Sequence, residues 1–210
     1  MKNISDKTLE ILKKVKAVFT DDHFVYTSGK HGKTYVNKDA IYPHTFVSSE
    51  IGKIFAEKYK NEEIDVVVSP ALGAIILSQW TAYHLSKLKN KEILGIYTEK
   101  TVDKNQILTR GYDKLVKNKK VLIVEDIVTT GGSIKKVVKT VTEAGGKVIG
   151  ACAIVNKDPE NIDTKSIGVP FSFLTIVDTE VFDEKDCPMC KANIPINTEL
   201  GHGKEFLAKH

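Results

Sequence analysis

Residues 121–133 read VLIVEDIVTTGGS: four aliphatic residues, two adjacent carboxylates, two more aliphatic residues and five small or hydroxylated ones. The pattern predicts a buried strand ending at Glu125 and Asp126, then a turn that opens into a helix from Ser133. Unpaired N–H groups at a helix start favour an anion, usually phosphate. The carboxylates would repel phosphate and instead suit hydroxyl groups or a cation that accompanies the ligand. The stretch therefore predicts a sugar-phosphate site. The alternative, a plain strand–turn–helix connection, would leave a costly acidic pair at a buried strand end.

The same stretch resembles the phosphoribosyl-pyrophosphate (PRPP) motif of type I phosphoribosyltransferases at every position. By this resemblance, Glu125 and Asp126 hold the ribose hydroxyls, and Mg²⁺ binds near them, largely through the substrate. The resemblance also implies that the following loop cradles the 5-phosphate through Thr129, Thr130, Gly131, Gly132 and Ser133.

Composition limits the class of protein. The chain has 210 residues, of which 41% are hydrophobic and 28% charged, as expected for one ordinary domain with a small appendage. No apolar run approaches the roughly 18 residues of a membrane span, and the N-terminus has an amphipathic pattern rather than that of a signal peptide. The net charge of +4 suits a polyanionic small molecule and is too weak to indicate nucleic acid. Three cysteines without a secretory signal favour reduced thiols and a cytoplasmic protein.

The order of predicted elements indicates an α/β fold: a doubly wound, mostly parallel sheet with an N-terminal helix-hairpin hood. A helix is expected at 6–19, a hairpin within 23–42 and a second helix from about Ser48. Strands and helices then alternate: strands at 64–69, 93–97, 121–125, 147–155 and 171–177, and helices at 73–88 and 133–144. The expected division is a helix and hood at 1–45, a core at 46–180 and a tail at 181–210.

Two further loops leave carboxyl ends of the predicted strands, where ligands bind in open α/β sheets. The first, SPALGAIIL from Ser69, has small residues that let a ligand approach the backbone. By resemblance it binds pyrophosphate through Ser69, Ala71, Leu72 and Gly73, although some family members carry lysine at the position of Gly73. An ordinary strand–helix joint would look similar.

The second loop, between Tyr97 and Val121, is long and has little periodicity, which is typical of lids or disordered segments. A mobile cationic loop would suit a reaction that expels pyrophosphate. By resemblance to orotate phosphoribosyltransferases, Lys100 is the catalytic lysine and the loop reaches across a dimer. The rest of the loop departs from the family pattern, so Lys104 is a candidate substitute. A solvated lysine-rich loop is the alternative.

Base recognition also rests on resemblance. FVYTSGKHGKTYVN, residues 24–37, resembles the hood hairpin of orotate phosphoribosyltransferases, with Lys30 in its basic position. Thr129 would contact the base, and Lys157 stands where the family uses an arginine on the orotate carboxylate. Lysine keeps that charge but loses the bidentate fork. A surface lysine after a strand is the other reading of Lys157.

The tail contains Cys187 and Cys190 in CxxC spacing, with His202 nearby. Zinc normally needs four ligands, so this spacing supplies half of a possible Zn²⁺ site. A reduced pair that closes a turn is the alternative. Cys152 is expected in the core. The other histidines show no ligand spacing, although His31 could face substrate: His23, His31, His44, His84 and His210.

The sequence is thus identified as a member of the type I phosphoribosyltransferases, most like those that act on orotate. The resemblance implies transfer of 5-phosphoribosyl from PRPP to orotate, giving orotidine monophosphate and pyrophosphate in pyrimidine biosynthesis, by a cytoplasmic homodimer with Mg²⁺. Two alternatives stay open. One is a phosphoribosyltransferase for another base, and the other is a non-catalytic regulator that senses PRPP.

Overall fold

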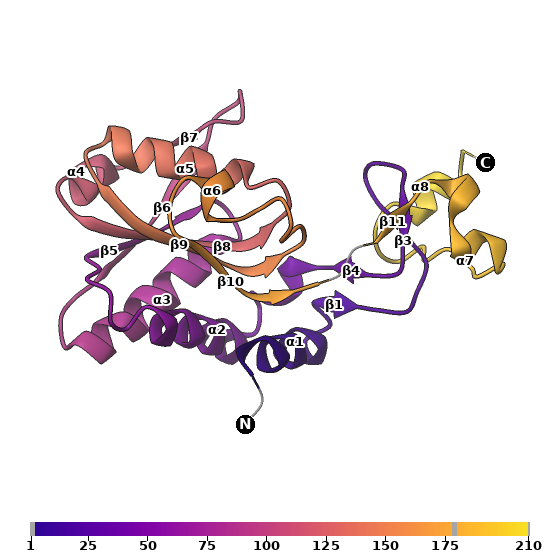
Figure 1. Cartoon of the computed structure of the whole chain (residues 1–210), viewed down its shortest axis with the longest axis horizontal. Helices are drawn as coiled ribbons and strands as arrows, with labels where there is room; N and C mark the ends of the chain where they lie inside the picture. The colour runs from indigo at the N-terminus through magenta and orange to yellow at the C-terminus, as the bar shows by residue number, and fades with distance from the viewer. Residues whose placement is uncertain (1–2, 178–179, 210) are drawn as a thin grey trace.

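A computed structural model describes residues 3–177 and 180–209, which form an α/β core and a smaller lobe (Figure 1). His210, one of the histidines without ligand spacing, lies outside the described residues. The core sheet has the strand order β10-β9-β8-β5-β6-β7, and all its pairings are parallel except that of β7. Its strands are β5 (Val66–Pro70), β6 (Leu94–Lys100), β7 (Gln106–Ile107), β8 (Lys120–Val128), β9 (Lys147–Asn156) and β10 (Phe171–Ile176).

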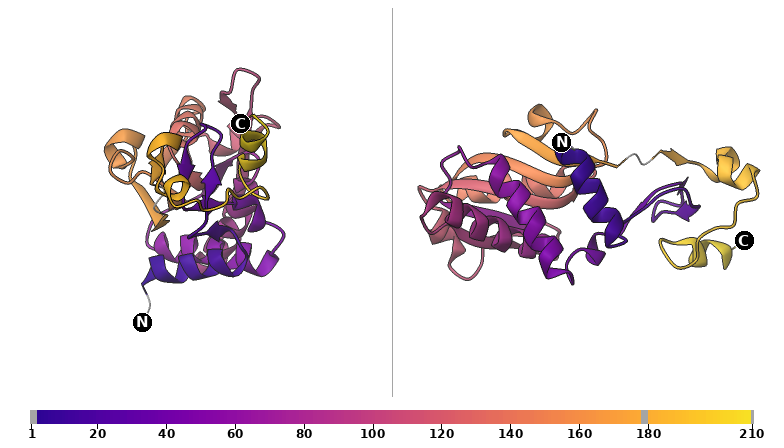
Figure 2. Two further views of the ribbon diagram at one scale, coloured as in Figure 1. Left: turned by 90° about the vertical axis from the view of Figure 1, so that its right-hand side faces the viewer. Right: turned by 90° about the horizontal axis from the view of Figure 1, so that it is seen from below.

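Helices cover both faces of this sheet, as predicted for a doubly wound fold. Figures 1 and 2 show one helical layer on each side. The first contains α1 (Ile4–Lys14), α2 (Thr45–Lys58) and α3 (Ala74–Lys89), and the second contains α4 (Tyr112–Val116), α5 (Gly132–Glu143) and α6 (Thr164–Ile167).

Alternation along the central strands explains why both layers pack well. In β8, Leu122 and Val124 belong to the apolar cluster that includes α2 and α3. Their neighbours Val121 and Ile123 belong to the opposite cluster, with α5. Successive strand side chains point to opposite faces, so an uninterrupted aliphatic run buries surface on both sides. Within the described residues, no helix has both the length and the apolar character needed to cross a membrane.

The remaining elements form the lobe, which lies beyond the carboxyl ends of the core strands (Figure 1). We call residues 20–34 and 180–209 the hood lobe. Its three-stranded antiparallel sheet has the order β11-β3-β2. The lobe comprises β2 (Phe24–Val25), β3 (His31–Gly32), β11 (Val181–Phe182), η2 (Glu184–Asp186), α7 (Pro188–Lys191) and α8 (Gly203–Leu207).

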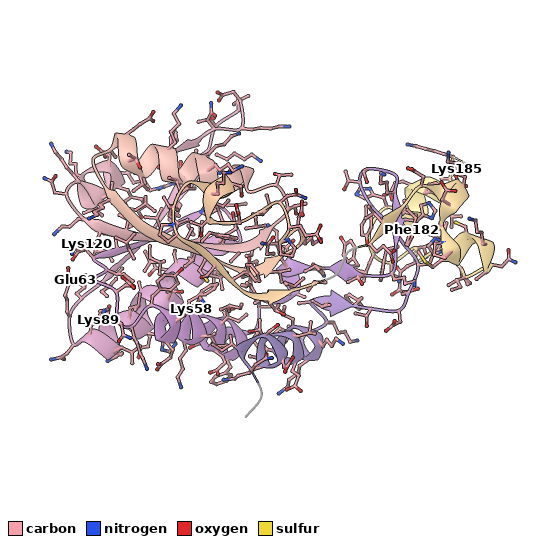
Figure 3. All side chains as sticks on the ribbon, viewed as in Figure 1. Lys58, Glu63, Lys89, Lys120, Phe182 and Lys185 are labelled. Atoms are coloured by element: carbon pink, nitrogen blue, oxygen red, sulfur yellow. The ribbon has the colours of Figure 1, made fainter. Side chains whose placement is uncertain are left out.

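A short antiparallel pair, β1 (Val18–Phe19) with β4 (Tyr35–Val36), joins the core to the hood lobe, and η1 (Lys38–Ala40) follows it. The predicted hairpin is therefore present. The hairpin packs with the C-terminal tail rather than on the core, because β3 pairs with β11 of the tail on one side and with β2 on the other. Figure 3 shows Phe182 and Lys185 in this lobe and Glu63, Lys89 and Lys120 at the far end of the core.

Three local predictions need correction. The helix expected at 6–19 ends at Lys14, and Val18–Phe19 form the strand β1. Strand β8 continues past Glu125 to Val128, and α5 begins at Gly132 after Gly131, whose φ of +70° makes the turn. The segment from 98 to 120 is not an irregular loop. Strand β6 runs on to Lys100 and pairs with β7, and α4 follows. Figure 1 shows the β6–β7 hairpin projecting from the core.

Candidate active site

The two acidic residues of the motif lie in β8 and are almost fully buried, with exposures of 6% for Glu125 and 2% for Asp126. The Glu125 side chain accepts a hydrogen bond from the Asp126 backbone N–H at 3.1 Å. Burial, reinforced by the neighbouring Asp126 charge, raises the pKa of Glu125 well above its usual range. Two adjacent carboxylates held out of water favour partners that donate hydrogen bonds or carry positive charge.

Besides the Ile127 backbone N–H, which donates to Oδ1 at 2.7 Å, Asp126 has two such partners from the segment after β4. The Tyr42 hydroxyl donates to Asp126 Oδ2 at 2.5 Å, and Lys38 Nζ lies 3.1 Å from the same oxygen. The pKa of Lys38 is raised, since the attraction of Asp126 and Glu125 outweighs the opposing effect of burial. Burial and the Asp126 charge also raise the pKa of Tyr42. Lys38 and Tyr42 are site residues that no sequence motif indicated, because they lie more than eighty positions away from Asp126.

The loop after β8 forms a cavity of about 190 Å³ beside Glu125. Its walls are the turn and the first residues of α5: Ile127, Val128, Thr129, Thr130, Gly131, Gly132, Ser133 and Ile134. The first N–H groups of a helix have no partner within the helix, so they are available to an anion at this place. The five loop residues expected to bind phosphate are therefore brought together next to the buried acids.

The predicted pyrophosphate loop meets the same site. A Cβ atom on Gly73 would lie 2.9 Å from Asp126 Oδ2 and 2.7 Å from the Tyr42 hydroxyl, so a side chain does not fit there without displacing them. This close approach explains glycine at a position where some family members have lysine. Ser69 is fully buried at the end of β5, and its hydroxyl has no hydrogen-bond partner among the described residues. Ala71 and Leu72 are joined by a cis peptide, and Leu72 is exposed.

A second cavity, of about 440 Å³, lies between the core and the hood lobe. Thr129 and Lys157 line it from the core, as the base-binding prediction requires, and burial lowers the pKa of Lys157. The other walls come from the lobe and the strands leading to it: Tyr26, Thr27, Ser28, Tyr35, Val36, Val181 and His202. Lys30 lies in the turn beside this wall, with its ammonium 3.5 Å from Asp183 Oδ1.

The predicted catalytic lysines lie on the β6–β7 hairpin. Lys100 ends β6, and Lys104 sits in the turn with a φ of +61°. The backbone carbonyl of Lys104 accepts a hydrogen bond from Lys136. Arg110 pairs with Glu99 at 2.8 Å. The structure thus attaches these cations to an ordered hairpin, while the lysine in contact with Asp126 is Lys38.

The tail residues are arranged differently from the sequence prediction. His202, the histidine close to the cysteines in sequence, lines the cavity and lies 3.0 Å from the Thr27 hydroxyl. His23 and His31, for which the spacing gave no hint, lie beside Cys187 and Cys190 instead. His31 is fully buried there, so the idea that it faces substrate was wrong.

A larger cavity of about 570 Å³ lies at the opposite end of the core, near Glu63, Lys89 and Lys120 (Figure 3). Its charged groups are satisfied within the fold: Lys91 pairs with Asp65 at 2.7 Å, Lys120 pairs with Glu63, and Lys89 donates to the Lys60 carbonyl at 2.8 Å. It lies at the amino ends of β5 and β8, whereas ligands of open α/β sheets bind at the carboxyl ends. The candidate active site is therefore the pair of cavities around β8.

Comparison with known proteins agrees with this arrangement. A family model for the phosphoribosyl transferase domain matches residues 37–184. The chain belongs to the phosphoribosyltransferase family. Among curated relatives, an orotate phosphoribosyltransferase of Caldanaerobacter subterraneus is 38% identical over 191 residues, 91% of this chain and 94% of its own length. One of Thermotoga maritima is 36% identical over 187 residues, 89% of this chain and 93% of its own length.

Solved structures of the family share the fold. The orotate phosphoribosyltransferase of Mycobacterium tuberculosis, in complex with Fe(III) dicitrate, superposes with a TM-score of 0.65. It is 22% identical and covers 81% of this chain and 96% of its own. The predicted architecture, a parallel sheet between two helical layers, is confirmed.

Proposed function

We propose that this chain is an orotate phosphoribosyltransferase, which transfers 5-phosphoribosyl from PRPP to orotate. The observation that carries the proposal is that two cavities share Thr129, the residue that follows β8. One is a small anion site at the start of α5, and the other is a larger cavity with the half-buried Lys157 in its wall. The buried acids lie beside the anion site, which suits a ribose whose 5-phosphate and base point in different directions. Curated relatives with this name, at 32–38% identity, support the assignment.

In the proposed reaction, the bond from the anomeric carbon to pyrophosphate breaks and a bond to a base nitrogen forms. Glu125 and Asp126 orient the ribose hydroxyls, and Thr129, Thr130, Gly131, Gly132 and Ser133 hold the 5-phosphate. Their fixed geometry lowers the entropic cost of reaching the transition state. The negative charge of the two carboxylates also favours the positive charge that develops on the sugar as pyrophosphate departs.

The pyrophosphate side of the site is proposed to include Ser69, Ala71, Leu72 and Gly73, with Lys100 and Lys104 approaching from the β6–β7 hairpin. The unpartnered Ser69 hydroxyl and the close approach at Gly73 support this placement. Lys100 and Lys104 would neutralise charge on the leaving group.

Magnesium fits the donor set of this site. Carboxylate oxygens suit a hard cation, and Mg²⁺ is usually bound through one or two carboxylates together with substrate phosphates. The raised pKa of Glu125 reflects burial next to the Asp126 charge, and a nearby cation would reduce the repulsion between the two carboxylates. When bound, Mg²⁺ would neutralise negative charge on the pyrophosphate.

We also propose a cytoplasmic homodimer with no nucleic-acid or membrane partner. Large apolar side chains near the pyrophosphate loop and the start of α2 support a dimer: Phe46 is 91% exposed and Leu72 is 83% exposed. Burying such exposed apolar side chains against a second chain is favourable.

The activity is tested by following orotate absorbance with PRPP and Mg²⁺, beside a panel of other nucleobases. Turnover with orotate and not with the panel is the expected result. Turnover with another base alone would replace the proposed specificity. PRPP binding without any turnover would instead indicate the regulatory alternative.

The Lys157→Met variant should raise the KM for orotate by roughly 10–100-fold, because a hydrogen bond to a charged group contributes about 1.5–3 kcal/mol. The KM for PRPP should stay within a factor of about three, since Lys157 lines the base cavity rather than the phosphate cavity. Steady-state kinetics with each substrate varied in turn measure both values. Lys165→Met, which alters an exposed lysine of α6, is the matched control. An equal rise in both KM values would place Lys157 outside base recognition.

A further inference from the structure

Four potential metal ligands converge in the hood lobe from two distant parts of the chain. His23 directly precedes β2 and His31 lies in β3, while Cys187 directly precedes α7 and Cys190 lies within it. Their donor atoms all lie within 4.8 Å of one another. His23, His31 and Cys187 are buried and Cys190 is half-buried.

The distances within this cluster are close to those of a tetrahedral site, and none exceeds 4.8 Å. Cys190 Sγ lies 3.3 Å from His31 Nδ1 and 3.7 Å from His23 Nε2, and Cys187 Sγ lies 3.6 Å from the same His23 nitrogen. The two histidine nitrogens are 2.8 Å apart. Around one zinc ion with Zn–N of about 2.0 Å and Zn–S of about 2.3 Å, neighbouring ligand atoms lie roughly 3.3–3.8 Å apart. The three histidine–cysteine distances already fall in this range, and inserting the ion requires the two histidine nitrogens to move apart by about half an ångström.

The surrounding hydrogen bonds favour ligation. His23 Nδ1 lies 2.8 Å from the Ile194 carbonyl, which can only accept, so this nitrogen carries the proton. In the neutral ring, His23 Nε2 then carries a lone pair that is directed at the other three ligands. A second ring nitrogen bonded to a carbonyl is the usual support of a metal-bound histidine. The backbone N–H of Cys190 likewise donates to Cys187 Sγ at 3.5 Å.

The hood lobe also has only a small hydrophobic core of its own. Within the described residues, neither of the two large apolar clusters contains a buried residue of the lobe. Its buried apolar side chains include Phe24, Val25 and Met189. Units this small usually need a metal or disulfides for stability, and all three cysteines of the chain are free thiols.

We propose that His23, His31, Cys187 and Cys190 bind one structural Zn²⁺ ion that fastens the C-terminal segment to the hood hairpin. Two thiolates and two imidazoles in tetrahedral array suit zinc among the common cellular metals. This part of the inference rests on the proposed function: the ion also holds one wall of the proposed base cavity in place. Val181 and His202 line that cavity from the C-terminal segment, and the His202 N–H donates to the Val25 carbonyl at 2.8 Å.

The test begins with metal content, which does not depend on activity. Elemental analysis and native mass spectrometry of the purified full chain should give one zinc per chain. Cys187→Ser and Cys190→Ser should each lose stoichiometric zinc, whereas Cys152→Ala, which changes the buried thiol in β9, should keep it. X-ray absorption should show two nitrogen neighbours at about 2.0 Å and two sulfur neighbours at about 2.3 Å.

Removal of the ion from the unaltered chain guards against variants that fail to fold. A strong chelator should speed proteolysis within residues 180–209 and leave the core resistant, and added Zn²⁺ should reverse this. Removal of zinc by the chelator should also raise the KM for orotate at least about tenfold, with little change in the KM for PRPP. If the zinc-loaded chain did not turn over orotate at all, the proposed function would be contradicted, whereas the evidence for zinc binding would be unaffected. A chain that stays metal-free in excess Zn²⁺ with three titratable thiols, or a Cys187→Ser variant with full zinc, would overturn the proposal.

Discussion

The Asp126→Asn variant should lower kcat/KM by roughly 10²–10³-fold, the cost commonly seen when one stabilising group is lost from a preorganised site. Asparagine keeps the shape, but its single side-chain oxygen can accept from only one of the Tyr42 hydroxyl and the Ile127 N–H, and it removes the charge that Lys38 faces and that would hold the ribose. The fold should be affected little, because Lys38 is 44% exposed and can turn to water. We expect a loss of about 1 kcal/mol in unfolding free energy, equal to one hydrogen bond.

Asp65→Asn is the matched control for this variant. Asp65 pairs with Lys91 and accepts from the Lys120 backbone N–H, at the opposite end of the strands. It should cost comparable stability and leave kcat/KM unchanged. Turnover and thermal unfolding of both variants separate the two effects. If Asp126→Asn lost activity only in proportion to its lost stability, Asp126 would be a structural residue rather than a substrate ligand.

Regular patterns account for what the sequence could predict. The aliphatic runs of β5, β8 and β9 signal burial on both faces, so the parallel sheet between helices follows directly from the sequence. The sequence also singled out the turn after β8, which lines the small cavity. The lining of the larger cavity was anticipated in part: Thr129 and Lys157 were named as candidates, while Tyr26 and His202 were not.

The missed features depend on tertiary contacts between distant segments. Lys38 and Tyr42 follow a short hairpin and carry no periodic signal, yet the chain brings them to Asp126. His23 and His31 lie eight positions apart, a spacing typical of no metal motif, and they meet the cysteines only because β11 pairs with β3. The β6–β7 hairpin was taken for a loop because β7 has only two residues. Short strands offer too few positions for alternation to be visible.

The Glu125→Gln variant should make the protein more stable and far less active. The cause is the raised pKa of Glu125, which burial sets first and the Asp126 charge reinforces. A carboxyl with a raised folded-state pKa contributes its full stability below the unfolded pKa of about 4.3, and this is lost as pH rises through the folded value. Above the unfolded pKa, Glu125 therefore lowers the free energy of unfolding relative to acidic pH. Glutamine removes the ionisable carboxyl and can still accept the Asp126 N–H through its carbonyl oxygen.

Thermal unfolding across pH tests the sign of this effect. The melting temperature of Glu125→Gln should exceed that of the unaltered chain at neutral pH, by about 2–4 °C for each kcal/mol gained at this chain length, and the difference should vanish below about pH 4. Glu50→Gln is the control with the opposite sign. The hydrogen bond from Lys7 lowers the pKa of Glu50, so its removal should cost stability at neutral pH.

The activity of Glu125→Gln should fall roughly a hundredfold or more, because the uncharged amide no longer stabilises positive charge on the sugar. Stability and activity then move in opposite directions, as expected where a buried charge is retained for function. A variant that lost both would mean that the carboxylate is satisfied within the fold, and the ribose would have to be held elsewhere. Equilibrium binding of PRPP distinguishes these cases, because a substrate-binding Glu125 predicts weaker PRPP binding by a protein that unfolds at a higher temperature.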